Sequence, residues 1–377
     1  MKKTFTALAA LLLLALAYFC FWPVPVEPVV WTPPVATGYV GPFAVNQKLA
    51  GLQMISLGAD EGPEHVAIGP DGKLYVAVAS GNILRMAPDG SAREVFVNTG
   101  GRVLGFDFDA AGNLVAADAL LGLLSIAPDR RISLLTSNVD GDPIRYADAV
   151  VVAKNPAAGG KIYFSDASTR FGAKQWGGTF EASVLDILEQ SSSGRVLEYD
   201  PARQSTRVVA RGLAFANGVA LSADGQHLFV SETGKYRVWK IAVGAKQVDV
   251  SRDGFDPAQA RVLLDNLPGY PDNLMAAPGG GKIWLGLVKP RNPTIDKLAG
   301  KPFMRKVTLR LPRMLWPIPK DYGHVLAFDE DGKILTNLQD PSGAYPETTG
   351  VTETADRLYL QSLHARALGW MLKPQQP

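Results

Sequence analysis

The stretch GVALSADGQHLFVSE, residues 218–232, consists of two short runs of apolar and β-branched residues separated by an Asp-Gly turn. Two such runs around a tight turn are typical of a β-hairpin. The same pattern occurs five more times along the chain. The other copies are HVAIGPDGKLYVAVA from His65, GFDFDAAGNLVAADA from Gly105, AVVVAKNPAAGGKIYFSDA from Ala149, NLMAAPGGGKIWLGL from Asn273 and GVTETADRLYLQS from Gly350.

Each hairpin is followed by a third strand-like run, such as GRVLEYDP or YRVWKIAV, and most units add a fourth, such as TRVVAR or RVLLDN. Units of four strands that recur at about 40 residues or more are typical of the blades of a β-propeller. An up-and-down β-sandwich is the alternative architecture. The sixfold recurrence favours the propeller.

The two ends of the repeat region indicate how the ring closes. The sixth unit ends at GWMLKPQQP without a fourth strand, whereas GLQMISL, residues 51–57, stands unassigned before the first unit. A circular fold that completes its last blade with an N-terminal strand leaves no open sheet edge. We therefore expect an all-β fold, a six-bladed β-propeller preceded by one N-terminal transmembrane helix.

The charge balance and the cysteine content exclude several classes of protein. The chain has 38 basic and 36 acidic residues and a formal net charge of +2, without the basic excess of nucleic-acid binders. We expect no nucleic-acid partner. The single cysteine, Cys20, excludes internal disulfides and thiolate metal sites.

The N-terminus predicts a membrane anchor. Lys2 and Lys3 precede an uncharged apolar run from Phe5 to Trp22, close to the length of about 20 residues that a bilayer span needs. A cleaved signal peptide is the alternative, but bulky residues occupy the place of a small-residue cleavage site. Positive charge stays on the cytoplasmic side. We therefore expect a single-pass membrane protein with a cytoplasmic N-terminus and a propeller on the periplasmic, extracytoplasmic side.

These features divide the chain into three parts. Residues 1–22 form the signal anchor, residues 23–37 a Pro-rich linker, and residues 38–377 the propeller. Proline-rich linkers are extended and stiff. We expect the linker to act as a spacer that lifts the propeller off the membrane.

Oxygen-bearing side chains recur where the predicted inner strands begin, at one end of the central channel. They are Glu64, Asp148, Asn217 and Asp272. Oxygen donors without clustered His or Cys suit Ca²⁺ or Mg²⁺ rather than zinc. The alternative is structural, because Asn-Gly and Asp-Asn are ordinary turn dipeptides. The neighbouring His65 should face away from Glu64 on an extended strand, so we expect a packed histidine.

Two further stretches stand apart from the repeat. Residues 291–322 are longer than a blade loop requires and mix Lys and Arg with Leu, Met and Trp. They either cover the channel mouth or contact lipid, or they pack on a neighbouring blade as a surface insertion. Residues 184–190 predict a short amphipathic helix. The motifs of serine hydrolases, zinc proteases, phosphate loops and dinucleotide-binding folds are missing from the sequence.

Several segments together resemble one known family. They include EGPEHVAI, YADAVVVA, GLAFANGVALSADGQHLFVSETGKYRVWKI and LPGYPDNL, which occur in order between residue 61 and the C-terminus. They resemble the strictosidine-synthase-like proteins, some of which carry an N-terminal membrane anchor. The resemblance implies a six-bladed propeller distantly related to the gluconolactonase and paraoxonase groups. Those groups hydrolyse lactones or esters with a central Ca²⁺ or similar divalent ion.

The resemblance also implies roles for individual residues. The metal-binding carboxylate of the first blade falls on Glu64, the asparagine of an Asn-Gly motif on Asn217, and the aspartate of an Asp-Asn motif on Asp272. A third-blade asparagine often joins them, but Ala147 stands there with Asp148 beside it, which leaves the fourth ligand open. The resembling lactonases imply that Asp272 is also the catalytic base.

Two departures from the family pattern limit what the resemblance implies. The glutamate that serves strictosidine synthesis is replaced by Thr349, so we do not expect that activity. The second-blade histidine of paraoxonases is replaced by the run from Val103 to Leu104. Two functions from different classes therefore remain. One is a metal-dependent hydrolase acting on a small-molecule lactone or ester, and the other is a non-catalytic binding or scaffold protein with a structural metal.

Overall fold

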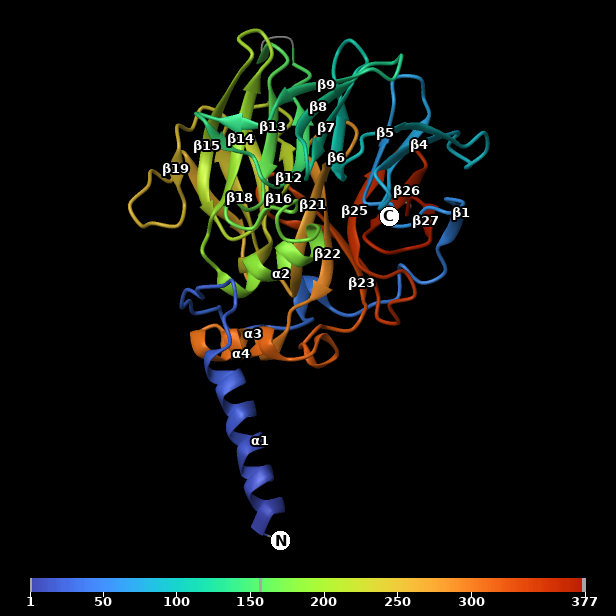
Figure 1. Ribbon diagram of the computed structural model, residues 1–377. Coiled ribbons are helices and arrows are strands. Elements are labelled where there is room, and N and C mark those ends of the chain that lie inside the picture. Colours follow the sequence, from blue (N-terminus) through green and yellow to red (C-terminus); the bar gives the residue numbers. More distant parts are fainter. Residues whose placement is uncertain (1, 156–157, 375–377) are drawn as a thin grey trace.

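A computed structural model describes residues 2–155 and 158–374. Residue 1 of the predicted anchor, residues 156 and 157 of the third hairpin, and residues 375–377 of the predicted propeller lie outside the described residues. The described chain forms a ring of β-sheets, and the helices lie at one end of this ring (Figure 1).

The first three blades follow one another along the chain, and in each the first four strands pair antiparallel, with the first strand innermost. Blade 1 comprises β2 (His65–Ile68), β3 (Leu74–Ala77), β4 (Asn82–Met86) and β5 (Glu94–Asn98). Blade 2 comprises β6 (Val103–Phe108), β7 (Leu114–Asp118), β8 (Gly122–Ile126) and β9 (Ile132–Thr136). The ribbon β10 (Asn138–Val139) and β11 (Asp142–Pro143) precedes blade 3, which comprises β12 (Ala147–Val152), β13 (Ile162–Asp166), β14 (Gly194–Asp200), β15 (Ser205–Leu213) and the parallel strand β19 (Val248–Asp249).

The remaining three blades complete the ring. Blade 4 comprises β16 (Ala216–Leu221), β17 (His227–Glu232), β18 (Arg237–Ala242) and β20 (Ala260–Leu264). Blade 5 comprises β21 (Gly269–Ala276), β22 (Lys282–Pro290), β23 (Gly323–Asp329) and β24 (Ile334–Asp340). Blade 6 comprises β25 (Thr348–Glu353), β26 (Arg357–Ser362), β27 (Ala367–Leu372) and, as its outer strand, β1 (Gln53–Ser56).

Blade 6 confirms the predicted closure. β1 pairs with β27 in antiparallel register, with Gln53 opposite Trp370 and Ser56 opposite Ala367. The first strand of the domain thus covers the edge that the last strand would leave open. The six-bladed propeller expected from the repeats is confirmed.

Glycines in the first two strands of a blade allow the inner strand of the next blade to approach closely. A Cβ on Gly218 of β16 would lie 2.4 Å from the main-chain oxygen of Asp272 in β21. A Cβ on Gly286 of β22 would lie 2.1 Å from the main-chain carbon of Thr349 in β25. Only a residue without a side chain fits at such positions. These contacts bring the inner strands, and the side chains at their beginnings, close together around the channel.

The N-terminal helix α1 (Lys2–Phe21) projects from the propeller (Figure 1). Its segment from Lys3 to Phe21 has a mean hydropathy of 2.2 and is not buried against the rest of the chain, so it is long and apolar enough to cross a membrane. Arg310 fixes its end, because the guanidinium donates hydrogen bonds of 2.8 Å to the Phe19 carbonyl and 2.7 Å to the Trp22 carbonyl.

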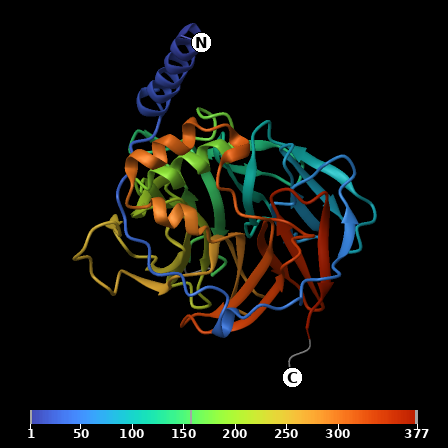
Figure 2. The same ribbon diagram turned by 90° about the horizontal axis from the view of Figure 1, so that it is seen from below.

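Three more helices lie at the end of the propeller from which α1 emerges (Figure 2). α2 (Thr179–Glu189) connects β13 and β14, and it begins five residues before the helix expected from residue 184. The insertion between β22 and β23 forms α3 (Pro293–Leu298), α4 (Pro302–Arg310) and the 3₁₀ turn η4 (Arg313–Leu315). Short 3₁₀ turns also occur as η1 (Gly41–Phe43) and η3 (Thr233–Lys235). The insertion therefore lies at the end of the propeller where the inner strands begin (Figure 2).

The Pro-rich segment is extended, but it does not separate the propeller from α1. The main-chain nitrogen of Glu27 donates to the Glu189 carboxylate at 2.7 Å, and that of Val29 donates to the Glu189 carbonyl at 2.8 Å. The guanidinium of the buried Arg305 donates to the Val29 carbonyl, and Val26 is fully buried. Hydrogen bonds of the main chain to α2 and α4 hold the segment on the propeller, so the expected spacer is wrong.

Candidate functional site

The four oxygen-bearing residues singled out from the sequence lie at the beginnings of four inner strands. Asp148 belongs to β12, Asn217 to β16 and Asp272 to β21, while Glu64 directly precedes β2. All four side chains are buried, and none exceeds 6% exposure. The ring therefore collects three carboxyl groups and one amide at the channel end that faces the helices.

Breaks in strand pairing explain how these side chains reach the channel. In five of the six blades the pairing between the first and second strands shifts register near the start of the inner strand. The shifts span Ala147–Val150, Ala216–Val219 and Pro271–Leu274, and so include Asp148, Asn217 and Asp272. β-Bulges redirect side chains and are frequent beside functional sites.

Burial and mutual repulsion dominate the electrostatics of Asp272 and Asp148. Burial raises the pKa of Asp272 well above its ordinary value, and the carboxylates of Glu64 and Asp148 raise it further. A hydrogen bond from the Asn217 side chain acts in the opposite direction. The pKa of Asp148 is likewise raised by burial and by Glu64. Like charges share this end of the channel at a cost in free energy.

Glu64 has more partners than the two aspartates. Burial raises the pKa of Glu64 to about 7, although the Arg102 guanidinium favours the charged form. The distance from Arg102 Nη2 to Glu64 Oε2 is 3.8 Å. Asn273 Nδ2 and Thr349 Oγ1 each donate a hydrogen bond of 3.1 Å to the main-chain oxygen of Glu64. Residues of blades 2, 5 and 6 thus fix Glu64 in position.

Several buried oxygens in the ring accept no hydrogen bond within the described structure. They are Glu64 Oε2, Asn217 Oδ1 and Asn273 Oδ1. Buried polar atoms are normally paired, and an unpaired one costs about 1–3 kcal/mol. Among residues 2–155 and 158–374, no three His, Cys, Asp or Glu side chains lie close enough together to form a metal site by themselves. The three carboxyl groups of the ring therefore do not converge on one cation position in this arrangement, and holding a cation here would require their side chains to shift toward it.

His65 packs against apolar side chains. Its ring lies 4.7 Å from the ring of Phe106, between centroids, and burial lowers the pKa of His65 to about 4. The imidazole is therefore neutral near pH 7. This position agrees with the packed histidine expected from strand alternation.

A second group of titratable residues lies at the same mouth of the channel. His364 Nδ1 contacts the Glu347 carboxylate, and Lys289 Nζ lies 2.8 Å from the other oxygen of Glu347. The hydrogen bond with Glu347 raises the pKa of His364. A half-exposed imidazole held by a carboxylate can donate or accept a proton near neutral pH. The sequence gives no sign of this pair, because no spacing in the chain links a turn after β26 to the residue before β25.

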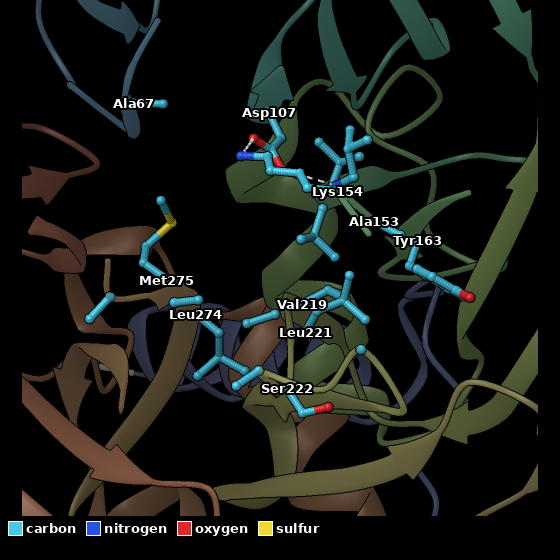
Figure 3. A pocket seen from close by; sticks show the side chains of 18 of the residues that line it. Ala67, Asp107, Ala153, Lys154, Tyr163, Val219, Leu221, Ser222, Leu274 and Met275 are labelled. Carbon is cyan, nitrogen blue, oxygen red and sulfur yellow. Dashed lines mark hydrogen bonds and ion pairs between the residues drawn. The ribbon is translucent and has the colours of Figure 1, made fainter. Parts of the chain in front are cut away.

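The opposite end of the channel contains a hollow of about 750 Å³ (Figure 3). The far ends of all six inner strands line it, largely with apolar side chains. Lys154 Nζ forms an ion pair of 3.0 Å with Asp107, and Lys282 Nζ lies 2.6 Å from Glu353. These two lining carboxylates are therefore compensated by lysines.

The comparisons with known proteins agree with this architecture. The family model described as strictosidine synthase-like, N-terminal, matches residues 41–86, and the one described as strictosidine synthase matches residues 148–245. Gluconolactonase from Xanthomonas campestris is a structural neighbour with a TM-score of 0.58 and 19% identity, covering 93% of this chain and 98% of the other. Regucalcin from Agrobacterium tumefaciens, a calcium-binding protein, has a TM-score of 0.56 and 13% identity, covering 86% and 96%. At such identities these two structures show the fold alone.

Curated relatives match over most of their length. Adipocyte plasma membrane-associated protein of Bos taurus is 28% identical over 393 residues, which cover 97% of this chain and 89% of the relative. The Arabidopsis thaliana protein strictosidine synthase-like 6 is 34% identical over 336 residues, which cover 87% of this chain and 83% of the relative. The chain belongs to the strictosidine synthase-like family.

Proposed function

We propose that this protein is a membrane-anchored hydrolase of lactones or esters that holds a divalent cation at the helix-covered end of the channel. Glu64, Asp148, Asn217 and Asp272 are the proposed ligands. The observation that supports this proposal is the burial of three mutually repelling carboxyl groups beside an unpaired amide oxygen. A bound cation would compensate the charges and use the free oxygens.

The donor set favours Ca²⁺ or another hard cation. Carboxylate and amide oxygens are the ligands that Ca²⁺ prefers, and Ca²⁺ tolerates irregular geometry. Two solved structures with this fold support the proposal. One is a gluconolactonase, which supports a lactone substrate, and the other is a calcium-binding regucalcin, which supports the cation. Asp148 is proposed as the fourth ligand because it is buried and close enough to Glu64 for their charges to interact.

The proposed chemistry assigns the proton transfer to Asp272. A divalent cation, when bound, supplies polarisation of a carbonyl oxygen. Asp272 takes a proton from the attacking water, whose oxygen forms the new bond to the carbonyl carbon. The bond from that carbon to the leaving oxygen breaks, and the leaving oxygen receives the proton. The hydrogen bond from Asn217 to Asp272 orients this carboxyl group for the transfer.

The test of this function is hydrolysis by the purified full-length protein. A panel of aryl esters and γ-lactones should contain substrates that it hydrolyses, and EDTA should abolish the activity until Ca²⁺ is restored. Asp272→Ala should lose turnover while its thermal unfolding remains cooperative. Asp253→Asn, which removes an exposed carboxylate in the loop between β19 and β20, is the matched control and should retain activity. Activity that persists in EDTA and in Asp272→Ala would refute the mechanism.

The proposed location follows from α1. Lys2 and Lys3 form the beginning of α1, before its apolar part, so the N-terminus should remain cytoplasmic and the propeller should lie outside. Protease added to spheroplasts should then degrade the propeller, and mass spectrometry of the purified protein should find the intact N-terminus. A soluble product that begins near residue 24 would refute the retained anchor.

A non-catalytic binding protein is the second candidate. It is favoured by the position of Arg102, which places positive charge beside Glu64, and by the two hydrogen bonds that hold the Glu64 main chain. These contacts are consistent with a ring of residues that mainly holds the blades together and does not catalyse a reaction. The two candidates differ in one measurement, because a structural ion would stabilise the protein without any hydrolysis across the panel.

A further inference from the structure

A pocket of about 190 Å³ lies between α2 and the insertion that contains α3 and η4. Its walls are almost entirely apolar. They include Val184 and Ile187 of α2, Ile295 of α3, and the segment from Trp316 to Pro319. Neither α2 nor α3 is part of a blade, so these walls of the pocket are formed by segments inserted between the strands of the propeller.

The inner end of the pocket adjoins the proposed catalytic ring. Thr233 lines the pocket, and its hydroxyl donates a hydrogen bond of 2.6 Å to the carbonyl of Pro271, the residue before Asp272. Leu363 also lines the pocket, and its carbonyl oxygen would lie 2.3 Å from a Cβ on Gly62, two residues before Glu64. The pocket and the ring are therefore neighbouring parts of one channel mouth.

Polar groups occur mainly at this inner end. Lys289 and Glu347 line the pocket there and form an ion pair of 2.8 Å. Glu347 interacts electrostatically with the ring, because its negative charge contributes to raising the pKa of Glu64. A ligand that fits would have an apolar tail in the pocket and a polar group at the ring.

α2 and the insertion, which line the pocket, lie on the face of the propeller from which α1 emerges (Figures 1 and 2). The exposed apolar side chains on α2 and on the insertion are Phe180, Phe303, Met304, Met314, Leu315 and Ile318. Residues 293–320 carry seven Lys and Arg residues, of which Arg305 and Arg310 are buried and five remain for the surface, and a single acidic residue, Asp296. Since Arg310 ties α4 to the end of α1, a bilayer spanned by α1 would lie against this basic and apolar face.

We propose that the pocket binds the acyl chain of an amphiphilic ester or lactone that reaches the channel from the bilayer. The chain lies between α2 and the insertion, and the carbonyl group lies at the ring of Glu64 and Asp272. This inference rests on the proposed function, because it defines the substrate class of the same site. It also assigns the insertion a role as the wall of the substrate pocket.

The first experiment measures the dependence of hydrolysis on chain length. Full-length protein in phosphatidylcholine nanodiscs is given p-nitrophenyl esters from acetate to dodecanoate. The value of kcat/KM should rise about fourfold for each methylene that the pocket buries, and then level off. In Val184→Phe the added ring occupies the pocket, so the ratio of decanoate to acetate should fall at least tenfold. Leu134→Phe, at an exposed position on β9, is the matched control and should keep the wild-type ratio.

The second experiment measures binding without catalysis. 11-Bromoundecanoic acid quenches tryptophan at short range, and Trp316 lines the pocket. Wild-type protein in nanodiscs should show a saturable quenching component that both Trp316→Phe and Val184→Phe lack. If that component is absent from the wild type, or if it persists in Val184→Phe, the inference is overturned. Saturable quenching without hydrolysis of any ester would support the pocket and refute only the proposed catalysis.

Discussion

Asn273 Nδ2 donates a hydrogen bond of 3.1 Å to the main-chain oxygen of Glu64, which joins the inner strands of two blades that are not neighbours in the ring. Both residues are buried. Asn273→Ala should therefore lower the free energy of unfolding by about 0.5–1.5 kcal/mol, because the Glu64 carbonyl loses one of its two buried donors and keeps the hydrogen bond from Thr349.

Urea denaturation followed by circular dichroism measures this loss. Gln226→Ala is the control, since its exposed side chain should change the free energy of unfolding by less than about 0.5 kcal/mol. Equal stability of the two variants would mean that the contact between Asn273 and Glu64 contributes nothing.

The buried carboxyl ring predicts how pH and cations act on stability. Burial raises the pKa of Glu64 from 4.5 to about 7, so the folded state binds a proton that the unfolded state releases between these values. The contribution of protonated Glu64 to the free energy of unfolding should be complete below pH 4.5. It should be lost as the pH rises through 7, and for a shift of this size the loss is on the order of 3 kcal/mol. Asp148 and Asp272, whose pKa values are also raised, should act in the same direction.

Thermal unfolding with EDTA or with Ca²⁺ at pH 5 and pH 8 tests this dependence. The rise in Tm caused by Ca²⁺ should be larger at pH 8, where the uncompensated carboxylates are charged. Glu64→Gln and Asp272→Asn should both reduce the rise, whereas Asp253→Asn should not. Identical Ca²⁺ responses in all three variants would show that the ring does not hold the cation.

The pair of His364 and Glu347 predicts a second effect of pH. The pKa of His364 is raised by Glu347, so its contribution to stability is complete below pH 6.5 and is lost as pH rises through the raised value. The pKa of Glu347 is lowered, with hydrogen bonds from His364 and Lys289 acting against burial, so the contribution also disappears under acid conditions. His364→Gln should cost less than about 1 kcal/mol near pH 5.5, because the imidazole is partly exposed.

The variant and the wild type should converge in stability above pH 8. His227→Gln, at the start of β17 in blade 4, serves as the control for removing an imidazole elsewhere in the propeller. A constant difference between His364→Gln and the wild type from pH 5 to pH 9 would contradict the ion pair.

The contact between Gly286 and Thr349 predicts a steric effect. A Cβ at Gly286 would meet main-chain atoms of Thr349 at 2.1 Å, and main-chain atoms cannot rotate away. Gly286→Ala should destabilise the protein by at least about 1–3 kcal/mol, the usual cost of overpacking. Gly244→Ala, where nothing lies within 4 Å of the added carbon, should be nearly neutral in the same chemical denaturation.

The repeats were sufficient to predict the blades, because each hairpin carries its own turn signal and the missing outer strand of blade 6 matches the spare strand before blade 1. The ring residues could be located for the same reason, since each stands where an inner strand begins. Their predicted role as metal ligands stays a prediction.

Contacts between separate loops could not be predicted. His364 and Glu347 flank different strands, and no local pattern indicates that their side chains meet. The Pro-rich segment was expected to be a spacer because its composition indicates stiffness. Its hydrogen bonds to Glu189 and Arg305 use main-chain atoms, which every sequence has, so composition alone gives no sign of them.

The pairing of β1 with β27 has a consequence for biosynthesis. β1 is the first strand to leave the ribosome, yet its partner β27 is completed only when synthesis reaches Leu372. During translation β1 therefore remains unpaired, close in the chain to the apolar helix α1. A nascent chain that stops before Ala367 keeps this exposed edge, and it should be recognised by chaperones or proteases as incomplete however many blades have already formed.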